Sequence, residues 1–237
     1  MNSLIISRDQ FLELEKISIG AFSPLKGFMN EKEFNSVVEQ MRLPSGDVFP
    51  LPVLMDIEKE VAHKIRDYDV VDLYYEEVLV GRLKPNDYFS CNRQDIAKKL
   101  FKTDSSNHPG VEFFYKLKPV FVGGEVELIK RPKFDIFFNE LTPKHTKKIF
   151  SDRGWKTIVG FQTRNVPHRA HEYLQRIALE HVDGLFIQPL VGKKQVGDFT
   201  PEAILGAYDA LVKNFFPTHR VFLGVLSTIM RYAGPRE

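Results

Sequence analysis

The segment FQTRNVPHRAHEYLQR concentrates side chains that could hold an anion. Its polar residues of interest are Gln162, Thr163, Arg164, Asn165, His168 and His171. The two histidines stand three positions apart, so on a helix their imidazoles would share one face. Arg164 can donate two parallel hydrogen bonds to a tetrahedral oxyanion, and the neighbouring amides add neutral donors. These residue types predict a cradle for phosphate or sulfate.

A helix is expected to begin within this segment. Pro167 suits a first helical turn, where the missing N–H costs no hydrogen bond. Apolar residues then recur at helical spacing and are predicted to face the core: Ala170, Leu174, Ile177 and Ala178. Both histidines would lie near the helix N-terminus, whose unpaired N–H groups and positive dipole end favour an anion.

The same residues are compatible with other chemistry. The histidines could decorate a solvated helix start, or they could share a zinc ion. No cysteine or nearby carboxylate completes a usual zinc ligand set, so no protein-bound metal is predicted. The sequence contains neither G-x-G-x-x-G nor G-x-x-x-x-G-K-[ST]. Dinucleotide binding and P-loop chemistry are therefore unsupported.

The elements around the segment predict a parallel sheet. KTIVGF, GLFIQPLV and HRVFLGVL read as buried strands, and PHRAHEYLQRIALEHV and TPEAILGAYDALVKNFF read as the helices between them. A further helix, PKHTKKIFSDRG, is capped by Thr142 and ends at Gly154. Right-handed crossovers would place these strands in one sheet flanked by helices. Ligands bind beyond the carboxyl ends of such strands, where residues 162–165 leave the first strand.

The first half of the chain has a different pattern of apolar and turn-forming residues. Short β-rich runs are broken by Gly, Pro, Asn and Asp, which indicates a compact mixed or barrel-like β domain. Ser7 is expected to cap one helix, and Asn30 with Glu33 a second. We expect two domains, a β-rich domain over residues 1–137 and a parallel α/β domain over residues 138–237.

The bulk composition is that of a soluble globular protein. The 237 residues are 43% hydrophobic and 27% charged, with a net charge of +2. That balance lacks the basic bias of a dedicated nucleic-acid binder, so no nucleic acid is expected as a partner. Cys91 is the only cysteine, which indicates a reducing compartment. Neither a signal peptide nor an apolar run of about 20 residues occurs, and we expect a cytoplasmic protein with no membrane segment.

The sequence GFQTRNVPHRAHEYL closely resembles the signature of the ATP sulfurylase (sulfate adenylyltransferase) family. Similar stretches occur in order along nearly the whole chain: IGAFSPLKGFMN, MRLPSGDVFPLPVLMD, HPGV, FVGGEVELI, RGW, DGLFIQPLVGKKQVGD and MRYAGPRE. The HRAH element is similar to the HIGH-type motif of the wider nucleotidyltransferase superfamily.

The resemblance implies a fold and an activity. The first half would be a PUA-like β domain, and the second a Rossmann-like nucleotidyltransferase domain. The enzyme would make adenosine 5′-phosphosulfate and pyrophosphate from ATP and sulfate, or run the reverse, in sulfur metabolism such as sulfate assimilation. Sulfate would attack the α-phosphate in line, without a covalent intermediate.

The resemblance also implies residue roles. Gln162 and Arg164 would hold sulfate, and residues 162–165 would also contact ATP. Thr163, Arg164 and Asn165 would form the active-site turn. His168 and His171 would stabilise charge on the phosphates. Mg²⁺ would arrive with ATP, and the full-length parent would be a homo-oligomer.

Three points stay open from the sequence alone. In the family a further strand and a G-R-D-H-type loop follow MRYAGPRE, so we expect the catalytic domain to be incomplete here. A catalytically incompetent fragment, or a module whose PUA-like half binds RNA or a partner protein, is the alternative function. Lys193 and Lys194 could contact a phosphate or lie in a solvated loop.

Overall fold

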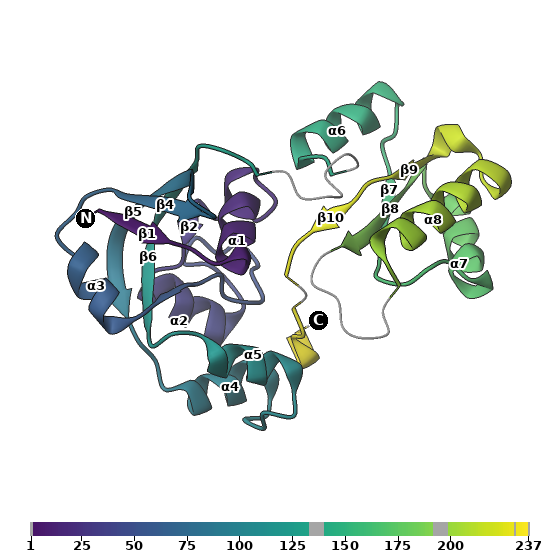
Figure 1. Ribbon diagram of the computed structural model, residues 1–237. Helices are drawn as coiled ribbons and strands as arrows, with labels where there is room; N and C mark the ends of the chain where they lie inside the picture. Colours follow the sequence, from purple (N-terminus) through teal and green to yellow (C-terminus); the bar gives the residue numbers. More distant parts are fainter. Residues whose placement is uncertain (1, 133–139, 192–198, 230, 237) are drawn as a thin grey trace. The chain divides into compact units, whose positions relative to one another are not determined.

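The computed structural model describes residues 2–132, 140–191, 199–229 and 231–236 (Figure 1). The chain divides into two compact units. The first comprises Met1–Pro132 with Met230–Glu237, and the second comprises Lys133–Ile229. The end of the chain is thus grouped with the first unit, whereas the sequence division at residue 137 assigned it to the second.

The first unit is built on a mixed six-stranded sheet in the order β1-β4-β5-β6-β2, with β3 also paired to β6. Its strands are β1 Ser3–Ile5, β2 Gly27–Phe28, β3 Met55–Ile57, β4 Val71–Tyr75, β5 Val78–Phe89 and β6 Val120–Leu128. β1 pairs parallel to β4, and the other pairings are antiparallel. At Gly27 a Cβ would come within 1.9 Å of the Gly124 carbonyl oxygen, so β2 can lie this close to β6 only with glycine there.

The helices of this unit are α1 Arg8–Ser18, α2 Glu31–Gln40, α3 Lys59–Ile65, α4 Arg93–Phe101 and α5 Pro109–Lys116. The predicted caps are confirmed. Ser7 forms a capping box with Gln10, and Asn30 forms one with Glu33. These local hydrogen bonds fix where α1 and α2 begin.

The chain end is fastened to the first unit by two arginines. The Arg236 guanidinium donates to the carbonyls of Val37 and Val38, near the end of α2, at 3.0 and 2.6 Å. It also donates to the carbonyls of Pro50 and Lys99, both at 3.1 Å. Arg231 pairs with buried Glu13, whose pKa is raised by burial against the opposing effect of that arginine. The MRYAGPRE motif therefore has a structural role within this unit.

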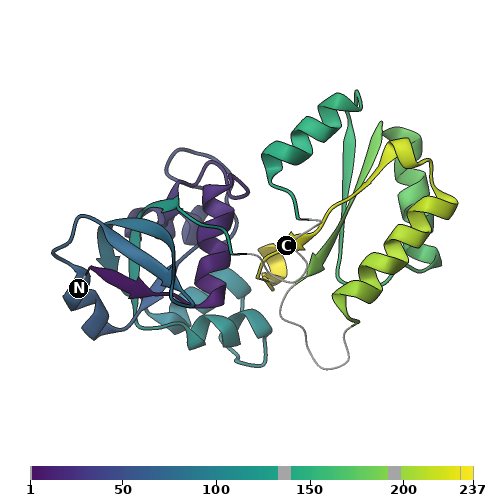
Figure 2. The same ribbon diagram turned by 45° about the horizontal axis from the view of Figure 1, so that its top comes forward.

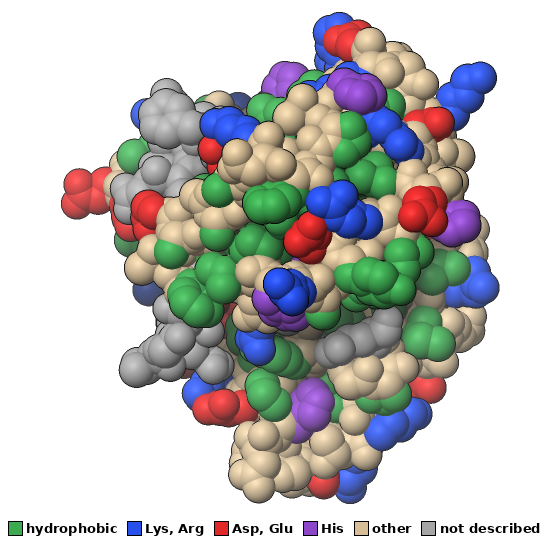
Figure 3. All heavy atoms as spheres, turned by 90° about the vertical axis from the view of Figure 1, so that its right-hand side faces the viewer, with side chains coloured by type: hydrophobic (Ala, Val, Ile, Leu, Met, Phe, Trp, Pro, Cys, Tyr) green, Lys and Arg blue, Asp and Glu red, His purple; other side chains and the backbone are tan. Residues whose placement is uncertain are grey.

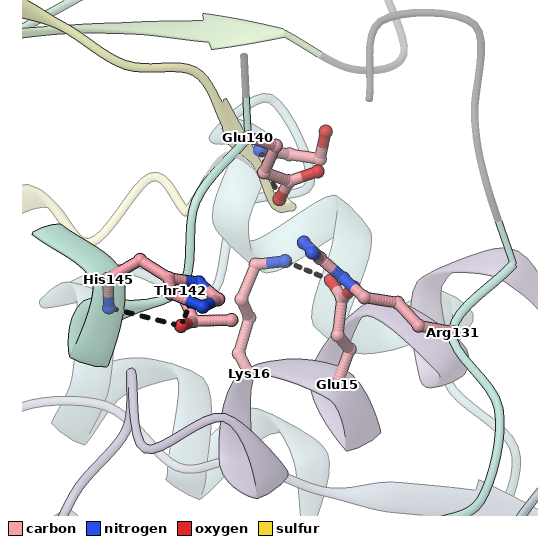
Figure 4. A network of polar contacts seen from close by, with 7 residues as sticks. Glu15, Lys16, Arg131, Glu140, Thr142 and His145 are labelled. Carbon is pink, nitrogen blue, oxygen red and sulfur yellow. Dashed lines mark hydrogen bonds and ion pairs between the residues drawn. The ribbon is translucent and has the colours of Figure 1, made fainter. Parts of the chain in front are cut away.

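A second charged cluster lies inside the first unit. Glu15 on α1 pairs with both Lys16 and Arg131 (Figure 4). Glu15 and Lys16 are almost fully buried. Removing one member of such a cluster strands a buried charge, which typically costs about 3–5 kcal/mol.

The second unit contains the predicted parallel sheet. Its elements are α6 Pro143–Asp152, β7 Ile158–Thr163, α7 Arg169–His181, β8 Gly184–Val191, α8 Pro201–Phe215, the 3-10 turn Thr218–Arg220, β9 Val221–Leu223 and β10 Leu226–Ser227. β8 is central and pairs parallel to β7 on one side and to β9 and β10 on the other. The βαβαβ prediction is confirmed, although its third strand runs in two short pieces.

Helices cover both faces of this sheet (Figure 2). On one face α7 and α8 bury a cluster formed by Leu179, Leu185, Ile187, Ile204, Tyr208, Phe216 and Val221. On the other, Phe150 of α6 contacts the rings of Phe186 and Phe222 at centroid distances of 5.4 and 6.1 Å. Successive residues of β8 point to opposite faces, as strand geometry requires.

Hydrogen bonds hold the start of the second unit in place. Thr142 caps α6 as predicted, its Oγ1 accepting the His145 amide at 3.4 Å (Figure 4). Buried Glu140 accepts the Ser227 amide at 3.2 Å and so anchors β10.

Among the helices of the described ranges, none is both long and apolar enough to cross a lipid bilayer.

Candidate active site

The predicted cradle begins where β7 ends. Gln162 and Thr163 are the last residues of β7 and lie in register with Gln188 and Pro189 of β8. The chain then bends through Arg164 and Asn165, both exposed. The Asn165 amide donates to Thr163 Oγ1 at 3.1 Å. A side chain that accepts from the backbone two residues later stabilises such a turn.

His168 caps α7 rather than lying inside it. Its Nδ1 accepts the Ala170 amide at 3.2 Å. The expectation that Pro167 starts the helix is wrong by two residues, because this histidine cap fixes the start at Arg169. A ring nitrogen that accepts a hydrogen bond carries no proton, so the proton of the neutral ring is on Nε2. His168 therefore offers Nε2–H as its donor.

His171 stacks against His168. The ring centroids are 3.8 Å apart with an interplanar angle of 27°, and Phe161 of β7 meets His171 edge-on at 5.5 Å. Burial lowers the pKa of His171, the neighbouring His168 lowers it further, and the Val166 carbonyl opposes both effects. The structure thus brings both predicted histidines together and favours a neutral His171.

The buried face of α7 differs from the prediction. Leu174 is 57% exposed and Ile177 is 37% exposed. The residues that are buried in α7 are Gln175 and Leu179. Figure 3 faces the side on which Figure 1 draws α7 and α8, and apolar side chains reach the surface there among charged ones. Two faces of α7 carry residues at helical spacing. The face that contains Gln175 and Leu179 packs against the sheet, and the face that contains Leu174 does not.

Two polar residues beneath the turn escaped the sequence analysis. Gln175 on α7 and Tyr208 on α8 are both 0% exposed. Burial raises the pKa of Tyr208, and the side chains of Thr163 and Gln175 oppose that shift. The available signal was spacing, since Gln175 follows His171 by four residues and so lies on the same helix face.

Residues outside the cradle hold its elements in place. Asp183 accepts the amides of Lys156 and Thr157 at 2.8 Å, which anchors the start of β7 and lowers the Asp183 pKa. Arg220 donates to the carbonyls of Leu179 and Val182 at the end of α7. The strand and the helix that flank the turn are therefore each fixed at their far ends.

The described residues assemble no metal-ligand cluster: within them, no group of three or more His, Cys, Asp or Glu could hold an ion. Lys193 and Lys194 lie outside the described residues. The site is therefore a turn of polar side chains at a strand end, facing a histidine-capped helix. Such an arrangement can bind an anion through N–H donors.

Comparisons with known proteins agree with this architecture. A PUA-like domain model matches residues 1–131, and an ATP-sulfurylase model matches residues 139–237. A sulfate adenylyltransferase of Thermococcus onnurineus is 41% identical over 99% of this chain and 61% of that relative. One from Pyrococcus abyssi is 40% identical over 98% of this chain and 60% of that relative. The chain thus spans about 60% of the length of these relatives.

A solved structure shares the fold. The structure described as a hexameric APS kinase from Thiobacillus denitrificans matches with a TM-score of 0.75 at 23% identity. The match covers 100% of this chain and 43% of that one.

Proposed function

The chain belongs to the ATP-sulfurylase family, and we propose on that premise that it acts as a sulfate adenylyltransferase. In the proposed reaction a sulfate oxygen attacks the α-phosphorus of ATP in line. The bond from that phosphorus to the oxygen bridging to the β-phosphate breaks, and adenosine 5′-phosphosulfate and pyrophosphate form. The reverse reaction uses the same groups.

The observation that carries the proposal is the cradle at the carboxyl end of β7. In the proposed site Gln162 and Arg164 hold sulfate, and residues 162–165 also contact ATP. The Arg164 guanidinium is suited to two parallel hydrogen bonds with sulfate. The exposed bend at Arg164 and Asn165, next to the start of α7, supports this assignment.

The histidines act on the phosphates in this proposal. His168 and His171 stabilise negative charge as pyrophosphate departs. Both act as neutral N–H donors, which agrees with the capping role of His168 and the lowered pKa of His171. Donors placed where charge develops are worth more in the transition state than in the ground state.

The reaction needs no general base. Sulfate is already anionic, so the difficulty is to bring two anions together and to stabilise the charge that builds on phosphate oxygens. Positioning and electrostatics account for catalysis of this kind. Mg²⁺ enters as the ATP complex, where it offsets phosphate charge.

We also propose the compartment, the assembly state and the ligands of this protein. We expect a cytoplasmic, homo-oligomeric enzyme of sulfur metabolism whose ligands are ATP, sulfate, adenosine 5′-phosphosulfate and pyrophosphate. The family and the hexameric description of the protein with the same fold support this proposal. Sedimentation equilibrium on the purified protein tests the assembly.

The direct test is pyrophosphate release from ATP and sulfate. We expect release that depends on sulfate and falls by about two to three orders of magnitude in Arg164→Ala. Arg82→Ala is the matched control, because Arg82 forms an exposed ion pair with Asp72 in the first unit. Absence of sulfate-dependent release, together with ATP binding that bulk RNA displaces, would instead favour the binding-module alternative.

A further inference from the structure

The first unit contains a cavity of about 240 Å³, and none of its lining residues belongs to the cradle. α3 forms one wall of this cavity, and the end of β5 with the start of β6 forms the other. The charged side chains that line it are all basic: Lys59, His63 and Arg66. A concave site with charge of one sign attracts a ligand of the opposite sign, so this cavity is suited to an anion.

The position of α3 explains why the basic residues converge. Its lining residues recur at helical spacing and share one face: Lys59, Ala62, His63 and Arg66. Arg66 follows the last turn of α3 with helical dihedral angles, so it stays on that face. α3 also follows β3 directly, and Ile57 of β3 pairs with Val120 of β6 (Figure 1). This pairing holds the basic face beside the start of β6.

The opposite wall supplies an aromatic ring and a hydroxyl. Tyr88 and Ser90 are alternate residues, so they point to the same side of the chain as β5 ends, whereas Phe89 between them is buried in the core. The Arg66 guanidinium lies over the Tyr88 ring, 5.5 Å from its centroid. The Tyr88 hydroxyl donates to the Ile65 carbonyl at 3.4 Å, which fixes the ring against α3.

The basic side chains of the cavity are available to a ligand. Within the described ranges, none of the ion pairs involves Lys59, His63 or Arg66. The acidic neighbours Glu58, Glu60 and Asp67 do not line the cavity. Arginine can donate two parallel hydrogen bonds to a phosphate, and lysine adds a point charge.

The size of the cavity narrows the class of ligand. A volume of 240 Å³ holds about eight water molecules at about 30 Å³ each, which is more than one inorganic anion fills. It is smaller than the roughly 300–1,000 Å³ of sites for drug-sized ligands. The ligand therefore carries a modest organic part beside its anionic group, and the Tyr88 ring offers that part an apolar wall.

We propose that this cavity is a binding site for a monosaccharide phosphate. Lys59, His63 and Arg66 hold the phosphate, Ser90 adds a hydroxyl, and the sugar ring lies against Tyr88. The residues of the site all belong to the first unit, so binding does not depend on the proposed adenylyltransferase activity.

The test is calorimetric titration of the 237-residue protein with ribose 5-phosphate. The protein carries Arg164→Ala, so that the cradle does not contribute to anion binding. We expect one site per chain, weaker binding of inorganic phosphate and none of ribose. Failure of ribose 5-phosphate to bind, or equal affinity for inorganic phosphate, would overturn the proposal.

Charge substitutions on α3 show whether binding occurs in this cavity. Lys59→Gln and Arg66→Gln should each weaken binding of ribose 5-phosphate by at least about tenfold, the loss expected for a charged hydrogen bond. Lys64→Gln is the matched control, because Lys64 lies on the same helix with the same charge and does not line the cavity. Equal weakening in all three variants would mean general electrostatic attraction and would overturn the site.

Filling the cavity tests the same site without a change of charge. Ala62 lines the cavity from α3 and is partly exposed, so Ala62→Phe places a ring in the ligand volume without entering the core. This variant should no longer bind ribose 5-phosphate, and thermal unfolding shows whether it is folded. Wild-type affinity in folded Ala62→Phe would place binding elsewhere. If that variant does not fold, the substitutions at Lys59 and Arg66 decide the question.

Discussion

Two substitutions at His168 separate its two roles. His168 caps α7 through Nδ1, and the proposed function uses Nε2–H on the phosphates. Asparagine is among the best N-cap residues but has no group that reaches as far as Nε2, whereas alanine supplies neither function. His168→Asn should therefore keep the helix start and lose the donor. His168→Ala should lose both.

The magnitudes follow from the cap geometry. The cap is a single hydrogen bond of 3.2 Å at an exposed helix start, so His168→Ala should lower the free energy of unfolding by about 1 kcal/mol. His168→Asn should stay within about 0.5 kcal/mol of wild type. Both should lower kcat by about two orders of magnitude, with a much smaller change in KM for ATP.

Urea unfolding and steady-state pyrophosphate release measure the two effects on the same preparations. The decisive variant is His168→Asn. If it keeps kcat near that of wild type, the imidazole is only a cap and its assignment to the phosphates is wrong. If KM alone rises, the ring is a ground-state contact. Equal stability of His168→Ala and wild type would contradict the capping argument.

Three further predictions concern other charged groups. Arg164→Lys should abolish adenosine phosphosulfate synthesis as Arg164→Ala does, because an ammonium cannot form two parallel hydrogen bonds; near-normal kcat/KM for sulfate would disprove it. Burial lowers the folded-state pKa of His171. The neutral His171 ring therefore contributes stability that is complete above the unfolded-state pKa of about 6.5 and is lost as the pH falls through the folded-state pKa. Urea unfolding from pH 8 to 5 should show that His171→Gln lacks this acid-side loss, and parallel curves for variant and wild type would contradict it. Arg236→Met should destabilise the first unit by about 2–3 kcal/mol, since one partly buried guanidinium donates to four carbonyls. Arg82→Met should cost less than about 1 kcal/mol, and equal losses in thermal unfolding would refute the role of the chain end.

The sequence by itself determined the features that depend on short-range signals. The caps at Ser7, Asn30 and Thr142 need only residues within one helical turn. The order of strands and helices after Leu141 follows from apolar periodicity and from the handedness of crossovers. The QTRN turn could be placed at the carboxyl edge of the sheet for the same reason. The family resemblance, which the comparisons confirm, supplied the substrates of the proposed reaction.

Only the tertiary structure decided which face of α7 is buried. The periodicity of Leu174 and Ile177 favoured an apolar face, yet the sheet packs against the stripe with His171, Gln175 and Leu179. Helical periodicity defines a stripe but not its partner, and a helix with two usable stripes is oriented by the surface it meets. Leu179 of α7 and Tyr208 of α8 belong to one core cluster although they are far apart in the sequence. The return of Arg236 to α2 is a second long-range pairing. Such long-range pairings leave no local pattern in the sequence, because they form only when the chain folds.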